Sequence, residues 1–288
     1  MHALHDNSER KTAKLRIGAV VYANARPLVR CLGEFVPEAD IVCDVPSRLA
    51  DGVAAGSLDV ALIPSIEHFR IPGTTIVSDA CIACEGPVRS VRLFSRVRLD
   101  AIASLALDEG SRTSAAMVRI MLAERFDVRP SLQPLPIGAS ADRLAVDAVL
   151  LIGDRGIQPP SGRFPRMWDL GEEWTRWTGL PFVFAMWVAR ADVDLDDLDR
   201  RLAEARDRGT TELAAIARED APSLGISEAE CLAWLRDNLV FRLGPRQCLG
   251  LERFRELAVA HGLVPGAAAL HFHAPSPSVA AARETRVS

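Results

Sequence analysis

Short apolar segments alternate with amphipathic ones in the first part of the chain, and this alternation constrains the fold more than any other feature. The segments LRIGAVV, IVCDV and LDVALIP are short, apolar and rich in β-branched residues, as buried strands are. Helices are expected at 27–35, with Pro27 at its start, and at 47–55, where Ser47 is placed to cap. This β-α-β-α-β order predicts parallel strands in a sheet that helices cover.

The same alternation starts again near residue 100, which predicts a second α/β unit. SLALD and DAVLLIGD are expected strands, with a helix at 111–126 before the second, and PFVFAMWVAR is a further buried strand. We therefore expect an α/β protein of two lobes with a cleft between them, the second lobe being inserted into the first. The expected bounds are 14–96 plus 190–264 for lobe 1 and 97–189 for lobe 2.

The last third of the chain is expected to be helical. Charged amphipathic patterns predict helices from Asp192 to about Arg218, at 227–238 and at 247–261. The Ala/Pro/Ser-rich tail 265–288 and the polar segment 1–13 are expected to be disordered.

Charge and hydropathy argue against two classes of partner. The formal net charge is -4, and no basic face is visible, so nucleic-acid binding is not expected. The longest strongly apolar run, LPFVFAMWVA, is far shorter than the roughly 20 residues that a membrane helix needs. The N-terminal residues lack the apolar core and cleavage site of a signal peptide, so a cytoplasmic location is expected.

Cysteines, histidines and short motifs do not indicate a metal or nucleotide site. Cys81 and Cys84 form a single C-x-x-C inside an apolar run, which favours buried core positions over zinc binding. The six histidines do not have the spacing of a metal site. G-x-G-x-x-G, P-loop and G-x-S-x-G motifs are absent as well, so neither nucleotide binding nor serine hydrolysis is supported.

Five short polar segments are expected where strands end. Ligands of doubly wound sheets bind beyond the carboxyl ends of the strands, so these segments should converge on one edge. Each segment alone is also what a turn or a helix cap requires. Five together predict a binding cleft: Tyr22–Asn24, Pro64–Ser65, Gly86–Ser90, Ser111–Ser114 and Gly153–Arg155.

Two of these segments carry a definite chemistry. Ser111-Arg-Thr-Ser114 opens a helix, and its hydroxyls and free N–H groups suit a carboxylate or a phosphate, whereas capping alone needs one hydroxyl. Asp154 ends an apolar strand, where a carboxylate accepts from ligand hydroxyls or moves a proton. Pairing with Arg155 or capping of the next turn would also explain Asp154. The residues alone thus predict an anion-binding cleft.

Taken together, these segments resemble the chorismate dehydratases of the futalosine route to menaquinone. The resemblance runs from Arg16 to Trp187, with a weaker echo in LGLERFRELAVAHGL. The stretches that carry it are RIGAVVYANARPL, LDVALIPSIEHF, SDACIACEGPVRSVRLFS, LALDEGSRTSAAMVRIML, DAVLLIGD and DLGEEWTRWTGLPFVFAMW. One difference is that Tyr-Ala precedes Asn24 where the family often has Leu before the Asn.

The resemblance implies a two-lobed type II periplasmic-binding-protein-like fold with a central cleft. It also implies a hydro-lyase, a carbon–oxygen lyase that converts chorismate to 3-[(1-carboxyvinyl)oxy]benzoate without a metal or cofactor. Position by position, it implies that Asn24, Ser90 and Asp154 are catalytic.

These residue types suggest distinct roles. The amide of Asn24 only exchanges hydrogen bonds at neutral pH, so we expect Asn24 and Ser90 to orient the substrate. The proton would go either to Asp154 or to the enolpyruvyl carboxylate of the substrate itself. Substrate-binding side chains are expected at Tyr22, Ser65, Arg89, Ser111, Thr113 and Ser114.

Two other functions compete with this interpretation. A non-catalytic anion-binding or sensor protein is the commoner use of such a fold, but a periplasmic one needs a signal peptide and a sensor needs an added module. A 1,4-dihydroxy-6-naphthoate synthase would share the fold, but its first loop typically reads Ser-Pro-Cys-Pro-Asn-Asp, unlike YANARPL.

Overall fold

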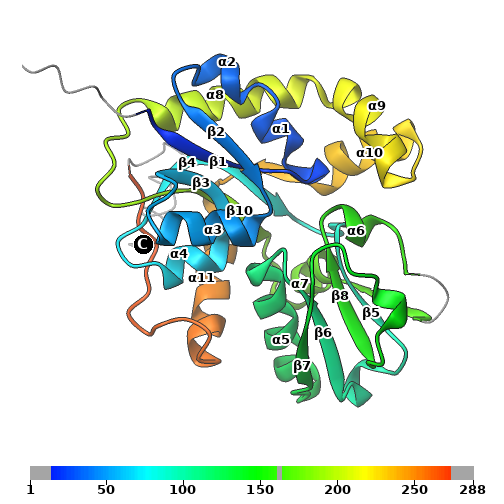
Figure 1. Cartoon of the computed structure of the whole chain (residues 1–288). Coiled ribbons are helices and arrows are strands. Elements are labelled where there is room, and N and C mark those ends of the chain that lie inside the picture. Colours follow the sequence, from blue (N-terminus) through cyan, green and yellow to red (C-terminus); the bar gives the residue numbers. More distant parts are fainter. Residues whose placement is uncertain (1–13, 161–163, 274–288) are drawn as a thin grey trace, which may run out of the picture.

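Two β-sheets organise the protein, which is described by a computed structural model at residues 14–160 and 164–273. Figure 1 shows the sheets as two layered units, each with helices packed against it. The first sheet has six strands in the order β11-β4-β10-β3-β1-β2. Its strands are β1 (Arg16–Val20), β2 (Asp40–Asp44), β3 (Val60–Pro64), β4 (Thr75–Cys84), β10 (Phe182–Ala189) and β11 (Val240–Arg242).

The second sheet has five strands in the order β7-β6-β8-β5-β9. Its strands are β5 (Val91–Ser95), β6 (Ser104–Asp108), β7 (Ser131–Leu135), β8 (Ala148–Ile152) and β9 (Arg166–Asp169). In each sheet the three strands of the βαβ units are parallel: β2, β1 and β3 in the first and β7, β6 and β8 in the second. Strands β10 and β5 join their sheets antiparallel.

Helices cover both sheets. In the first unit they are α1 (Arg26–Val29), α2 (Leu32–Phe35), α3 (Pro46–Ala54), α4 (Ser65–Arg70), α8 (Leu198–Thr211), α9 (Leu213–Leu224), α10 (Glu228–Ala233) and α11 (Pro245–Ala260). In the second unit they are α5 (Arg112–Phe126), α6 (Asp154–Ile157) and α7 (Leu170–Thr178). Short 3-10 turns lie at η1 (Ala23–Ala25), η2 (Leu99–Ala101) and η3 (Ala141–Arg143), and η4 (Trp234–Asn238) is a π-helical turn.

The core explains why the apolar runs became central strands. Every residue of β3, β8 and β10 is buried, because each of these strands has neighbours on both sides and helices over its faces. Strand β2 lies at an edge, and only Asp44 in it is even partly buried. Cys81 and Cys84 lie fully buried in β4, as their apolar context predicts.

The chain crosses between the sheets earlier than the sequence pattern indicates. Residues 91–95, expected in lobe 1, form β5 of the second sheet, and residues 182–189, expected in lobe 2, form β10 of the first sheet. The boundaries expected at 96/97 and 189/190 are therefore wrong with respect to the sheets. The expected nesting of one α/β unit within the other stays a prediction.

Several expected helices differ from those observed. The helix expected at 27–35 is divided into α1 and α2 at Arg30–Cys31, and the long helix expected after Asp192 is divided into α8 and α9 at Glu212. Val45, not Ser47, is the N-cap of α3, and Pro46 occupies the first turn. The helix expected at 227–238 ends in the π-helical turn η4.

The C-terminal segment follows the first sheet further than expected. Phe272 forms a parallel bridge with Ile76, and the Ile76 N–H donates to the carbonyl of His271 at 2.7 Å. The expectation of disorder from residue 265 is thus wrong for 265–273. The expected tails 1–13 and 274–288 lie outside the described residues.

Candidate active site

Asp154 connects the two α/β units. It is the first residue of α6, directly after buried β8, and its Oδ1 accepts a hydrogen bond from the Ala23 N–H at 2.9 Å. Ala23 follows β1, so this bond joins the carboxyl end of a strand in one sheet to that of a strand in the other. Both lie at the edge where α/β sheets bind ligands.

The surroundings of Asp154 favour its protonated form more than water does. Burial raises the pKa of this carboxyl, the Ala23 N–H opposes that change, and the Asp220 carboxylate adds to it. A carboxyl with a raised pKa is better matched to proton transfer near neutral pH than an ordinary aspartate. This geometry supports the predicted acid–base chemistry of Asp154, although a catalytic role stays a prediction.

Two glycines of the second unit allow the Tyr22 ring to pack directly against their backbone. Gly153 has φ 57° and ψ −140°, and a Cβ there would lie 2.8 Å from Cγ of Tyr22. A Cβ on Gly110 would lie 2.5 Å from the Tyr22 hydroxyl oxygen. Burial and the carboxylates of Asp108 and Asp154 raise the pKa of Tyr22, so its phenol stays neutral and able to donate.

Asn24 presents a buried acceptor to a cavity between the units. Asn24, Tyr22, Gly153, Ser111 and Ser114 line this cavity together with apolar side chains, and its volume is about 380 Å³, open space at its mouth included. Within the described chain, Asn24 Oδ1 is buried and has no hydrogen-bond partner. Because buried polar atoms are almost always paired, this oxygen suits a donor supplied by a ligand. We call this space the inner cavity.

The start of α5 supplies hydroxyls to the same space. Ser111 is the N-cap, and its Oγ accepts from the Ser114 N–H at 3.4 Å. The two hydroxyl oxygens are 3.1 Å apart. The free N–H groups at the start of this 15-residue helix favour negative charge. The predicted convergence of Tyr22, Asn24, Ser111 and Ser114 is therefore present in the structure.

Ser65 and Thr113 lie nearby but fasten two helices together. Ser65 Oγ donates to the Val183 carbonyl at 2.7 Å and lies 3.3 Å from Thr113 Oγ1. Thr113 Oγ1 accepts from the Ile66 N–H at 3.1 Å. Neither side chain is among those lining the inner cavity, so their part in substrate binding stays a prediction.

The turn that carries Arg89 and Ser90 is held from several sides. Asp169 accepts from the N–H groups of Val88 and Arg89 at 3.0 and 2.8 Å, and Trp234 Nε1 donates to the Val88 carbonyl at 2.9 Å. The backbone of Arg89 has φ 60°, which is uncommon for residues other than glycine.

Ser90 is fully buried behind this turn. Its Oγ donates to the Val88 carbonyl at 3.4 Å, and its own carbonyl lies against Gly156, where a Cβ would come within 2.5 Å. Ser90 thus lies against α6, the helix whose first residue is Asp154. Val91, the next residue, lines the inner cavity, whereas Arg89 and Ser90 do not. Their predicted roles stay predictions.

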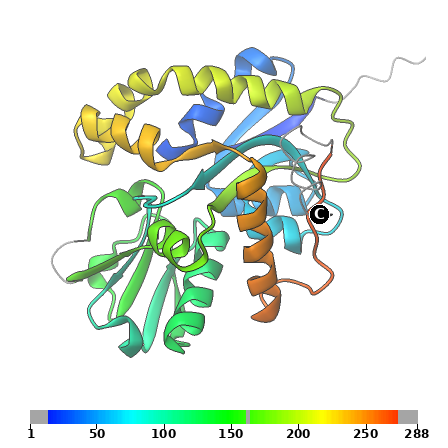
Figure 2. The ribbon, with the colours of Figure 1, turned by 180° about the vertical axis from the view of Figure 1, so that it is seen from behind.

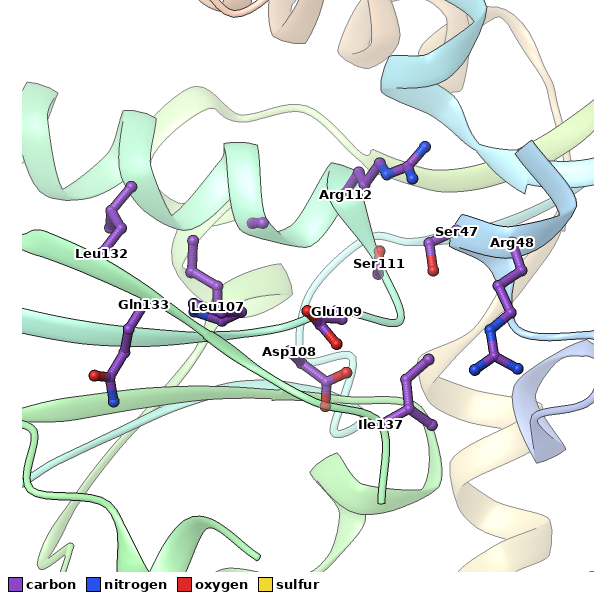
Figure 3. A pocket seen from close by; sticks show the side chains of 12 residues that line it. Ser47, Arg48, Leu107, Asp108, Glu109, Ser111, Arg112, Leu132, Gln133 and Ile137 are labelled. Atoms are coloured by element: carbon purple, nitrogen blue, oxygen red, sulfur yellow. The ribbon is translucent and has the colours of Figure 1, made fainter. Parts of the chain in front are cut away.

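A larger, open cavity adjoins the inner one at Ser111, and we call it the outer cavity. Its volume is about 1000 Å³, solvent at its mouth included. Figure 3 shows Ser47 and Ser111 beside each other at its wall, with Arg48 to the right of Ser47, and with Glu109, Asp108 and Ile137 below. Ser111 lines both cavities, so the outer cavity leads from solvent toward the inner one.

Sequence reasoning missed Asp108, and it offered Arg155 as a possible partner of Asp154, whereas Arg155 pairs with Asp108 in the structure. Asp108 ends β6, is 2% exposed, accepts from the Gly110 N–H at 2.9 Å and pairs with Arg155 Nη1 at 3.0 Å. Burial raises the pKa of the Asp108 carboxyl. Its position, a carboxylate at the end of an apolar strand, is the same signal that identified Asp154, so the pattern SLALD could have revealed it.

The described residues form neither a cluster of metal ligands nor a helix that could span a membrane. Over residues 14–160 and 164–273, no three His, Cys, Asp or Glu side chains are grouped to hold a metal ion. None of the helices in these ranges has the length and apolar character needed to cross a membrane.

Comparison with known proteins identifies the family. The menaquinone biosynthesis family matches residues 15–260. A chorismate dehydratase of Thermus thermophilus is 30% identical over 266 residues, which cover 83% of this chain and 93% of the relative. The chain belongs to the menaquinone biosynthesis family. The resemblance noted in the sequence is thereby confirmed.

Solved structures show the fold of this family member. The alkanesulfonate-binding protein SsuA of Xanthomonas axonopodis superposes with a TM-score of 0.56 at 16% identity, over 94% of this chain and 97% of SsuA. A Candida albicans protein with the generic periplasmic binding protein fold gives 0.54 at 12% identity, over 86% and 90%. An Archaeoglobus fulgidus protein gives 0.64 at 13% identity, over 88% and 100%. The predicted periplasmic-binding-protein-like fold is confirmed.

Proposed function

We propose that this protein is a chorismate dehydratase, a hydro-lyase that removes water from chorismate to give 3-[(1-carboxyvinyl)oxy]benzoate. The observation that carries the proposal is the inner cavity, where an unpartnered amide oxygen and the hydroxyls of a helix start meet. The partly buried carboxyl of Asp154 does not line this cavity but directly follows Gly153, which does. The name of the Thermus thermophilus relative supports it.

The reaction breaks the C3–H and C4–O bonds and forms the C3–C4 π bond and an O–H bond of water. The C3–H bond gives its electron pair to a new C3–C4 double bond, the C4 hydroxyl leaves, and the proton and hydroxide end as water. Because the product ring is aromatic, the chemistry is downhill and the protein mainly has to position its substrate. Hydroxyls and N–H groups at the start of α5 suit one carboxylate of the dianion.

Asn24 would hold the departing hydroxyl, whose O–H is the donor that the buried Oδ1 lacks. Ser90 would orient the substrate from the turn before β5. The base is either Asp154, whose pKa burial raises, or the substrate's own enolpyruvyl carboxylate. Tyr22, Ser65, Arg89, Ser111, Thr113 and Ser114 are the proposed substrate-binding residues.

Incubation of purified protein with chorismate, followed by mass spectrometry, tests the proposed reaction. The expected product is an aromatic enol ether lighter than chorismate by one water. Chorismate that binds unchanged would instead favour a non-catalytic anion-binding protein. Absence of any interaction would leave the 1,4-dihydroxy-6-naphthoate synthase alternative open.

Two variants test the residue roles. Asn24→Ala should turn over far more slowly, and full-rate turnover would refute the orienting role. Asp154→Asn with near wild-type kcat and intact chorismate binding would remove Asp154 as the base and favour the substrate carboxylate. Asp100→Asn, which loses an exposed carboxylate paired with Arg98, is the matched control.

A cytoplasmic location is part of the proposal, and cell fractionation tests it.

A further inference from the structure

A separate cavity lies between α5 and the end of α11, among residues that the proposed reaction does not use. Its volume is about 530 Å³, space at its mouth included. Figures 1 and 2 both show α5 beside α11, and the two helices are in contact. The walls come from the middle of α5, the connection into β7 and the residues after α11.

The charge of this cavity is one-sided. Arg119, Arg129 and His261 line it, and no acidic side chain does. The Arg119 guanidinium is partly buried, yet it makes no hydrogen bond or ion pair to any described residue. Burial and the neighbouring Arg70 guanidinium lower the pKa of Arg119. None of its nitrogens is buried from solvent, so all of its N–H donors are free to bind an anion that enters the cavity.

The other charged groups around the cavity are already paired. Arg129 contacts Asp127 at 2.7 Å, and His261 Nε2 lies 2.7 Å from Glu124. Arg70 pairs with Glu67 at 2.7 Å and donates to the Leu263 carbonyl at 3.0 Å. Arg119 is therefore the one guanidinium at this cavity, among the described residues, that still lacks a counter-ion.

The remaining wall is apolar. Ile120, Val128, Pro130, Leu132 and Leu263 line it, and Leu132 is 43% exposed. A fully hydrophilic anion such as phosphate would leave this surface in water, whereas a ligand with an apolar body would bury it. One free guanidinium also matches a single carboxylate, with which it forms two parallel hydrogen bonds.

We propose that this cavity binds a small aromatic carboxylate. Arg119 would be its counter-ion, and the apolar wall just described would lie against the ring. The site is distinct from the inner cavity, but helix α5 contributes to both. Ser111, the N-cap of α5, lines the inner cavity, and Arg119 lies about two helical turns further along the same helix. Residues 261–263 follow a helix of the first unit, so a ligand here contacts both units.

Isothermal titration of the full chain with benzoate, without chorismate, tests the site. Wild-type protein should bind benzoate, and Arg119→Gln should weaken one site at least about tenfold while keeping the same unfolding temperature. Arg143→Gln is the matched control, because Arg143 is an exposed arginine with no described partner and lies away from this cavity. It should bind as wild type does. Inorganic phosphate should bind more weakly than benzoate.

Two further measurements separate this site from the cleft. Asn24→Ala should keep the Arg119-dependent benzoate site, so failure of the proposed reaction would not affect the result. In a crystal soaked with 4-iodobenzoate, the anomalous iodine signal should lie between α5 and α11. Iodine found only in the inner or outer cavity, unchanged binding by Arg119→Gln, or phosphate binding as tightly as benzoate would each overturn the proposal.

Discussion

Gly153→Ala should disturb both the stability and the activity of the protein. Gly153 combines φ 57° with ψ −140°, a region that residues with a Cβ rarely enter, at a cost of about 1–3 kcal/mol. The new methyl would also lie 2.8 Å from the Tyr22 ring, and such overpacking costs about 1–3 kcal/mol. Since the ring is already against Gly110, it has little room to yield.

The two costs together predict a loss of about 2–6 kcal/mol, a large part of a typical folding free energy. Activity should fall further, because Asp154 follows directly and a shift of about 1 Å can cost a hundredfold in rate. Urea unfolding and kcat/KM for chorismate measure the two effects.

Gly33→Ala in α2 is the control, since nothing lies within 4 Å of its added methyl. It should be neutral or stabilising by up to about 1 kcal/mol. The reasoning about the Tyr22–Gly153 contact is refuted if Gly153→Ala unfolds within about 0.5 kcal/mol of wild type and keeps its kcat.

Three more results are expected. Ser111→Ala should lose about 0.5–2 kcal/mol in urea unfolding and raise KM, because it removes a cap and a cavity hydroxyl, whereas Ser140→Ala removes a cap elsewhere and should leave KM unchanged. As pH rises through the folded-state pKa of Asp154, the wild-type protein should lose unfolding free energy and Asp154→Asn should not, so the variant becomes more stable relative to wild type. The reason is that burial raises this pKa, so the native state binds the proton more tightly than the unfolded chain and the stabilisation disappears as pH rises; a gain that is equal at all pH values would contradict this. Asp169→Ala should cost about 3–5 kcal/mol, because it strands Arg92 and four backbone N–H groups, and an unchanged unfolding midpoint would show that Asp169 does not hold the Arg89–Ser90 turn.

Most of the buried strands could be predicted from the sequence because their signals are local. Runs such as AVLLI and VALIP are buried on both faces, and an apolar β-branched run of that length already indicates this. Sheet membership could not be predicted in the same way. Nothing within 91–95 or 182–189 indicates which sheet each strand joins, because the choice depends on partners far along the chain. The short strands β9 and β11 were missed for the same reason.

The candidate site shows the same division. Tyr22, Asn24 and Ser111 could be predicted to converge, because the carboxyl ends of parallel strands meet at one edge. The packing of the Tyr22 ring against Gly110 and Gly153 could not, since it depends on how the two units face each other. Asp108 was overlooked although its local signal equals that of Asp154.

Chorismate that carries deuterium at C3 offers the most direct test of the proposed dehydration. The account predicts an aromatic product without deuterium, because the C3–H bond is the one broken, and far slower formation of that product with Asn24→Ala. A product that retains the deuterium, as rearrangement of the enolpyruvyl group would give, or chorismate recovered unchanged would contradict the account.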